Sequence, residues 1–168
     1  MKEGNIKMAN KKLTTSIMSK SLAKFNERIS LTVTDRFSDS YNIEINKYFK
    51  TSEVQKLIVD YLSFKEELPN LVNELELIKD TTYLYYALLV KYFTNVPFSD
   101  NLVELISGVE TLIDLEIFDH IIGALPKEEI ERVNDLIKKM TDNLPLANKL
   151  LGIENDKTTE EVQELVEE

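Results

Sequence analysis

The sequence predicts a mainly α-helical fold, a bundle of about six helices preceded by one small β-hairpin. Three observations carry this prediction. Apolar residues recur at intervals of three and four over most of 52–152, strict alternation is confined to 29–46, and the four Gly and four Pro are too few for a loop-rich fold. We therefore expect a basic arm over 1–28, a single domain over 29–152 and an acidic tail over 153–168.

The hairpin is expected over 29–46. Ile29, Leu31 and Val33 alternate with polar residues, and a second alternating run follows at Tyr41, Ile43 and Ile45. Turn-forming residues lie between the two runs, at 35–40. Because a lone two-stranded hairpin is only marginally stable, its apolar face must lie on the helices that follow, on a third strand or on another copy of the chain.

The helical bundle is expected over 52–152. Ser52 and Gln55 form a capping box at the start of its first helix, and Pro69 marks the end of that helix. A second helix follows over about 70–79. The most apolar stretch, 83–93, is typical of a helix at the centre of a bundle.

The second half of the bundle begins after the helix-breaking residues 95–97. Ser99 or Asp100 caps a helix whose apolar residues repeat at three and four between Leu102 and Ile113. The period falters around Asp114, which predicts a kink or break before a helix over 116–124. The last segments are a helix that starts at Pro126 with Glu128 and Glu129 in its first turn, a short helix bracketed by Pro145 and Gly152, and an amphipathic stretch capped by Thr158 and Glu161.

Composition argues against an enzyme. The chain has no Cys and one His, which excludes disulfides, thiolate metal sites and most His-based metal centres, and no Gly-rich phosphate-binding loop is present. Glu116 and His120 are four residues apart and would share a helix face, so a carboxylate–His ligand or base pair stays open beside a plain structural role for His120. We expect no catalytic residue, no cofactor and no metal.

Charge is unevenly spread along the chain. The net charge is −10, yet residues 1–28 carry +5 and residues 153–168 carry −6. An acidic body repels phosphate backbones, so we expect no nucleic-acid partner, and no apolar run is long enough to cross a membrane. The arm is read as a solvated or docked segment, with a targeting role or a partner contact as alternatives. The tail is typical of a solubilising segment that could also fold on a basic partner or on the chain's own arm.

Aromatic side chains cluster around 83–98. The candidates for a partner-binding surface are Tyr85, Tyr92, Phe93 and Phe98, because tyrosine is enriched in interface hot spots and six rings are more than one helix face can bury. The alternative is that most of these rings belong to the core.

In its order of elements the chain resembles the phage tail assembly chaperones of siphovirus type. The likeness runs over 29–144, chiefly through Tyr83–Pro97, Leu102–Asp114 and Leu125–Ile130. The resemblance implies a non-enzymatic protein of the bacterial host cytoplasm, of phage or prophage origin, that binds the tape-measure protein and recruits tail-tube subunits. The basic arm before Ile29 has no counterpart in that likeness.

We therefore expect an interaction protein that takes up a partner helix in an apolar cleft lined by Tyr85, Tyr92 and Phe98. A homo-oligomer stays open. One alternative is an acidic decoy that occupies the cationic groove of a nucleic-acid-binding protein, with strongly salt-dependent binding. A second is an enzyme or metal protein centred on His120.

Overall fold

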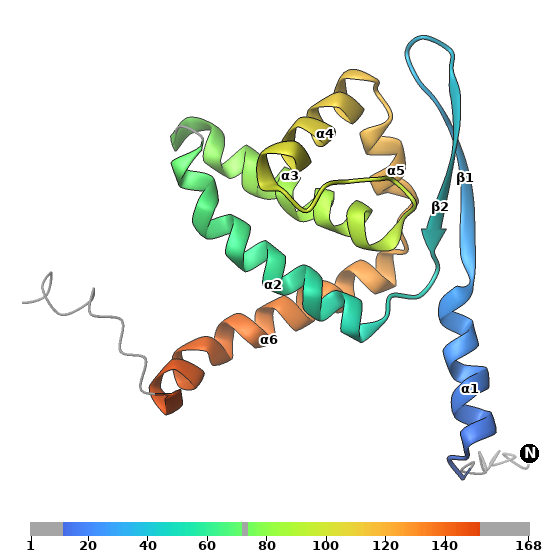
Figure 1. Cartoon of the computed structure of the whole chain (residues 1–168), viewed down its shortest axis with the longest axis vertical. Helices are drawn as coiled ribbons and strands as arrows, with labels where there is room; N and C mark the ends of the chain where they lie inside the picture. The colour runs from blue at the N-terminus through green and yellow to red at the C-terminus, as the bar shows by residue number, and fades with distance from the viewer. Residues whose placement is uncertain (1–11, 72–73, 152–168) are drawn as a thin grey trace, which may run out of the picture. The chain divides into compact units, whose positions relative to one another are not determined.

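The computed structural model describes residues 12–71 and 74–151, with side chains described for 12–71 and 81–140. It confirms the mainly α fold, with six α-helices and one two-stranded antiparallel hairpin in the described residues (Figure 1). The chain forms two compact units, Met1–Glu129 and Ile130–Glu168. The acidic tail and the expected cap at 158–161 lie outside the described residues.

The basic arm contains a helix that the sequence pattern did not predict. Helix α1 spans Thr15–Ala23, and the Thr14 hydroxyl accepts a hydrogen bond from the Ile17 amide at 3.3 Å. A 3-10 turn at Lys24–Asn26 then leads into the hairpin. α1 buries none of its side chains.

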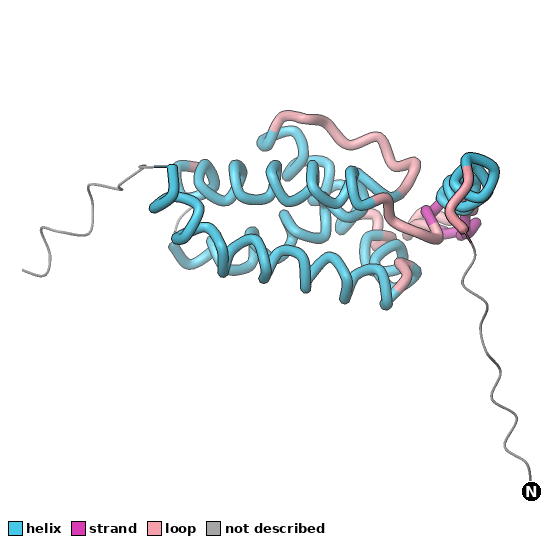
Figure 2. The backbone as a smooth tube through the Cα atoms, turned by 90° about the horizontal axis from the view of Figure 1, so that it is seen from below, coloured by secondary structure: helices cyan, strands magenta, loops and turns pink. Residues whose placement is uncertain are grey.

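The expected hairpin is confirmed. Strand β1, Arg28–Thr34, pairs with β2, Ser40–Asn46, in a register that sets Leu31 opposite Ile43. Within the described residues, strands are confined to this hairpin (Figure 2). β1 contacts α5, and Ile45 forms an isolated bridge with Thr94, so the apolar face lies on the helices of the same chain.

Asn95 forms three hydrogen bonds with the backbone of β2. Its amide donates to the Glu44 carbonyl at 3.1 Å, its side-chain Oδ1 accepts from the Glu44 amide at 2.9 Å, and its Nδ2 donates to the Asn42 carbonyl at 3.4 Å. At the hairpin turn, the Arg36 amide donates to the Leu115 carbonyl at 3.2 Å. The residues after α3 and after α4 thus both hold the hairpin.

The capping box predicted at Ser52 is wrong. Helix α2 spans Thr51–Glu67, and its N-cap is Lys50, which makes no side-chain capping bond. The Glu53 and Val54 amides bond instead to the Lys50 carbonyl. The helix therefore starts two residues earlier than a cap at Ser52 predicts, directly after the fully buried Phe49 and its neighbour Lys50. Pro69 does mark the boundary, inside a 3-10 turn at Leu68–Asn70.

Helix α3 spans Glu74–Phe93 and merges two segments that the sequence pattern separated. No Gly or Pro lies between Ile78 and Tyr83, so nothing in the chain interrupts the hydrogen-bond ladder there. The apolar stretch is central, as expected: Leu88, Leu89 and Val90 are fully buried. α3 contacts α2, α4 and α5.

Helices α4, Leu102–Asp114, and α5, Phe118–Ala124, are separated by the predicted break. At that break Glu116 adopts a φ of 62°, which no residue inside a right-handed helix has. The predicted cap was wrong by one or two residues: Asn101 caps α4, its Oδ1 accepting from the Glu104 amide at 3.1 Å. Ser99 supports this cap by accepting from the Asn101 amide at 3.1 Å.

Helix α6 spans Lys127–Leu151 and starts directly after Pro126, with Glu128 and Glu129 in its first turn as predicted. The separate short helix expected after Pro145 is wrong, because α6 continues through that proline to Leu151. The boundary between the two compact units falls inside this helix, after Glu129. In the first unit, the Glu129 Oε2 accepts a hydrogen bond from the Phe49 amide at 3.1 Å.

Candidate functional site

An apolar pocket lies between α3 and α4. It has a volume of about 60 Å³ and includes side chains from two turns of α3 and from most of α4. Its lining residues are Tyr83, Leu84, Ala87, Leu105, Ile106, Val109, Glu110 and Ile113. The floor is buried and the rim is open: Leu105 is fully buried, whereas Ile113 is 36% exposed.

The pocket opens onto an exposed stripe of α4. Val103, Ile106, Glu110 and Ile113 follow one another at intervals of three and four, so they lie along one side of the helix. Val103 is 58% exposed, Ile106 is half-buried and Glu110 is exposed. We call Val103, Ile106, Glu110 and Ile113, together with the pocket, the α3/α4 groove. Exposed apolar side chains beside an apolar pocket are features that surfaces binding amphipathic helices share.

Small residues shape this region. Ala87 on α3 is buried against the groove, and Gly108 on α4 faces the ring of Phe98. A Cβ atom on Gly108 would lie 2.8 Å from Phe98 Cε1 and 2.9 Å from Cδ1. The loop between α3 and α4 can therefore lie against α4 only because residue 108 has no side chain.

The four aromatic residues predicted as a partner surface do not line this pocket. Tyr85 is half-buried and packs edge-on to Tyr61 of α2, with ring centroids 5.9 Å apart. Tyr92 is half-buried, and Phe98 lies against Gly108 of α4. Tyr85 and Tyr92 thus contact residues of α2 while Phe98 packs on α4, so the structure does not bring the three rings into one cleft.

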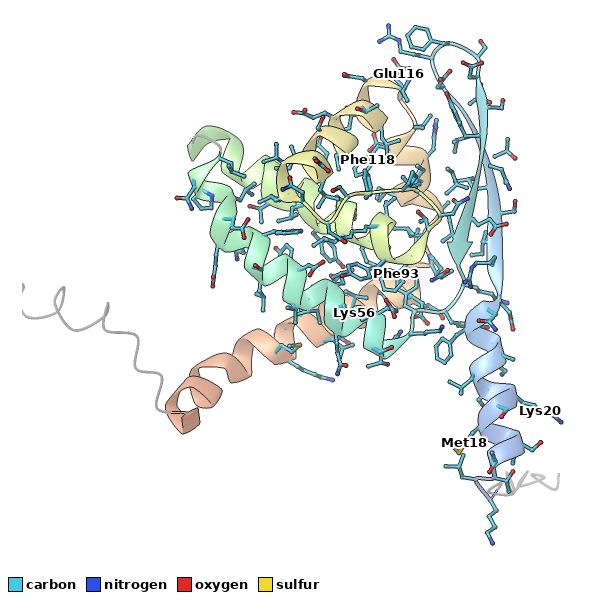
Figure 3. All side chains as sticks on the ribbon, viewed as in Figure 1. Met18, Lys20, Lys56, Phe93, Glu116 and Phe118 are labelled. Carbon is cyan, nitrogen blue, oxygen red and sulfur yellow. The ribbon has the colours of Figure 1, made fainter. Side chains whose placement is uncertain are left out.

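Phe93 belongs to the core. Phe93, labelled in Figure 3, is fully buried. It stacks face to face on Phe49, with ring centroids 3.7 Å apart and an interplanar angle of 2°. A ring in this position meets no partner while the fold is intact, so we leave it out of the candidate surface.

Tyr92 takes part in a polar cluster beside the core. Its hydroxyl donates to Asp60 Oδ2 at 2.8 Å, and Lys91 Nζ lies 3.4 Å from the same oxygen and 2.7 Å from Asp100 Oδ1. Burial, followed by the hydrogen bond to Asp60, raises the pKa of Tyr92. The Lys91 ammonium lowers the pKa of Asp100 by hydrogen bonding and by its charge. These contacts join α2, α3 and the loop that follows α3, which is a structural role.

Sequence reasoning missed most of the groove. In the sequence Tyr83 is one of several clustered aromatic residues, and the α4 residues form an ordinary helical stripe. One signal was available: apolar residues at Val103, Ile106 and Ile113, added to those at Leu102, Leu105, Val109 and Leu112, make the apolar face of this helix wider than one neighbour can cover.

His120 lies at a second pocket, between β1 and α5, of about 480 Å³. Leu31–Thr34, Gly123 and Ala124 line it with the imidazole. The pairing of His120 with Glu116 on one helix face is wrong, because α5 begins at Phe118 and Glu116 lies in the break before it. Among the described side chains, no group of three or more His, Asp or Glu lies close enough together to hold a metal ion.

No helix in the described part of the chain combines the length and the apolar character needed to cross a membrane. The described residues thus form a mainly helical protein with an apolar pocket between α3 and α4.

Comparison with known proteins gives the family. The sequence model of the YomO family matches residues 10–168, so the chain belongs to the YomO family. A relative is the SPbeta prophage-derived uncharacterized protein YomO of Bacillus subtilis (strain 168), 24% identical over 140 residues that cover 82% of this chain and 81% of the relative. The chain is thus phage-related, as the resemblance implied. No solved structure matches it.

Proposed function

We propose that the chain is a non-enzymatic phage tail assembly chaperone that holds an amphipathic helix of the tape-measure protein in the α3/α4 groove and recruits tail-tube subunits. The observation that carries the proposal is the groove itself: an apolar pocket lined by the partly exposed Ile113, with the exposed Val103 on the same side of α4. Its phage-related family and its mainly helical fold support the same function.

The chemistry of the groove defines the partner segment. An α-helix with apolar residues at intervals of three and four would fill the pocket and cover the stripe of α4. Glu110 lies on the rim and is exposed, so a Lys or Arg beside the apolar face of the partner helix would meet an opposite charge. An exposed pair of this kind sets orientation more than affinity.

The acidic surface has a separate role in this proposal. A net charge of −10 keeps a protein with an exposed apolar groove from associating with itself and repels nucleic acid. Reversible capture suits a long partner, since several weak sites along it hold many copies of a chaperone without one tight interface.

The test is co-purification with the tape-measure protein encoded by the same phage or prophage. We expect the double substitution Val103→Asp and Ile113→Asp to weaken capture at least about tenfold, because each places a charge where an apolar contact is required. The matched control is Val59→Asp with Leu71→Asp: these side chains are 61% and 51% exposed and are not among the groove residues. Circular dichroism of both variants establishes that they fold.

Salt separates this function from the acidic decoy. Capture by an apolar groove persists at about 500 mM salt, where surface charges are screened within a few ångströms. Binding that disappears at high salt and is indifferent to Val103→Asp with Ile113→Asp would contradict the chaperone and favour a decoy for a basic protein.

A further inference from the structure

Strand β1 has one edge that faces away from β2. The Lys47 amide donates to the Glu27 carbonyl at 3.1 Å, and the Asp35 amide donates to the Asp39 carbonyl at 2.9 Å. Bonded and non-bonded pairs alternate along an antiparallel ladder, so the backbone groups of the odd-numbered residues of β1 face β2. The N–H and C=O groups that face away belong to the even-numbered residues, which are Arg28, Ser30, Thr32 and Thr34.

The two outer edges of the hairpin differ. On β2 the outward groups of Glu44 bond to Asn95, and in Figure 1 β2 lies between β1 and the end of α3. On β1 no hydrogen bond from elsewhere in residues 12–71 and 74–151 reaches the outward backbone groups. Ser30, Thr32 and Thr34 are also exposed. The β1 edge is therefore open to another strand.

The composition of β1 does not protect this edge. Edge strands commonly carry Pro, Lys, a bulge or an inward-pointing charge, which prevents them from pairing with another chain. β1 pairs with β2 without interruption, and residues 29–34 contain no charged residue, no Pro and no Gly. The pocket that includes His120 is lined by Leu31–Thr34 of the same strand, and a Cβ atom on Gly123 would meet nothing within 4 Å. An added strand thus finds backbone groups to bond and space for its side chains.

We propose that β1 pairs antiparallel with β1 of a second copy of this chain, which joins two hairpins into one four-stranded sheet around a two-fold axis. Among the symmetric registers, only the one centred on Leu31 pairs all four outward residues of each strand, which gives eight hydrogen bonds. In this register Arg28 lies opposite the partner subunit's Thr34. Ser30 lies opposite the partner subunit's Thr32.

The side chains of β1 fit this occupant. On the apolar face, Ile29 would meet the partner subunit's Val33, and Leu31 would meet the partner subunit's Leu31. Ile29 is 36% exposed and Leu31 is half-buried in the single chain, so the pairing covers apolar surface. On the other face the pairs are formed by Ser and Thr, which are favourable cross-strand neighbours.

The charges beside the edge are already paired within each copy. Glu27 binds Lys47 at 2.9 Å, and Asp35 Oδ1 accepts from the Phe37 amide at 2.8 Å. The charge of −10 on each copy opposes association through other surfaces, and screening of this repulsion by salt strengthens the dimer. β1 contributes no residue to the α3/α4 groove, so the dimer and the proposed chaperone function are tested separately.

A single introduced cysteine tests the register, because the chain has no other cysteine. We expect Leu31→Cys to form a disulfide-linked dimer in oxidised glutathione, since directly opposite non-bonded residues have Cα atoms about 4.5 Å apart, within disulfide range. The matched control is Ile29→Cys on the same face of β1, whose Cα lies more than about 10 Å from its symmetry mate and which should stay unlinked. Circular dichroism establishes that both variants fold. A folded Leu31→Cys chain that stays unlinked, or equal linking of both variants, overturns the proposal.

Sedimentation equilibrium tests the dimer without a cross-link. We expect a dimer at about 100 μM chain and a lower dissociation constant at about 500 mM salt than at about 50 mM. Thr32→Pro removes an outward N–H and no bond to β2, so it should raise the dissociation constant at least about tenfold, whereas Thr32→Val should not. A wild-type chain that is monomeric at this concentration overturns the proposal and leaves the edge for a strand of another protein. A dimer that salt dissociates, or that Thr32→Pro leaves unchanged, overturns it as well.

Discussion

At Gly108 the α4 backbone leaves just enough room for the ring of Phe98. A methyl group there would lie within 3 Å of two ring carbons. Phe98 is an aromatic ring on a short stem rather than a long flexible chain, so the ring can yield only by moving the loop that carries it.

We expect Gly108→Ala to destabilise the protein by about 1 kcal/mol. Overpacking costs about 1–3 kcal/mol, while the higher helix propensity of alanine returns about 1 kcal/mol. Urea unfolding of Gly108→Ala and of the double variant with Phe98→Leu measures this. The smaller side chain should recover most of the loss; a Gly108→Ala protein more stable than the wild type would mean that the ring is not held against α4.

The direction in which each aromatic ring points cannot be predicted from the sequence pattern. The cluster of rings at 83–98 was evident, but whether a ring faces α2, α4 or the core depends on the rotation of α3 and on where its neighbours pack. Phe93 stacks on Phe49, 44 positions earlier in the chain, and nothing local to either residue indicates that pairing. The groove residues Tyr83, Leu84 and Ala87 were hidden for the same reason.

Among the elements, those with strong local signals were predicted. The alternation at 29–46 gave both strands, and the faltering period near Asp114 gave the break between α4 and α5. The first residue of a helix was predicted less accurately, because several consecutive polar residues are each able to cap it. α2 starts after Lys50 without a side-chain cap, and α4 starts after Asn101, whose Oδ1 accepts from the Glu104 amide.

Replacement of the observed and the expected caps distinguishes them. We expect Asn101→Ala to cost about 1 kcal/mol of folding free energy, because the Glu104 amide loses its acceptor. Ser52→Ala should change stability by less than about 0.5 kcal/mol, since Ser52 is exposed in the first turn of α2. Equilibrium urea titration of both variants is sufficient. Equal losses would mean that Ser52 also caps a helix.

For the whole molecule, ionisation of half-buried tyrosines lowers the stability of the fold at alkaline pH. Burial raises the pKa of Tyr85, Tyr92 and Tyr61, and contacts with Tyr86 and Asp60 raise the first two further. A phenol whose pKa is raised in the folded state contributes its full stability below the unfolded pKa of about 10. That contribution is lost as the pH rises above this value, because the unfolded chain ionises first.

We therefore expect the free energy of unfolding to fall as the pH rises above about 10, and to fall less steeply in a Tyr85→Phe and Tyr92→Phe double variant. Urea titration across this pH range gives the slope. Tyr48→Phe is the control, because Tyr48 precedes α2 and is not among the groups that raise the pKa of Tyr85 or Tyr92. A double variant that declines as steeply as the wild type would place the alkaline loss in the lysines instead.

During synthesis on the ribosome, the hairpin is made well before Asn95, the residue that bonds to β2. β1 and β2 are synthesised before any helix that covers them, and the residue that fastens Glu44 follows 51 positions later. At translation rates of about 5–20 residues per second, the nascent hairpin waits roughly 3–10 s for that anchor. During this interval Val33, Ile43 and Ile45, all buried in the finished protein, have no helix to rest on. Slow stretches of translation before residue 95 would prolong this exposure, whereas the same delay after residue 124, when α5 has also been made, would leave the hairpin already secured.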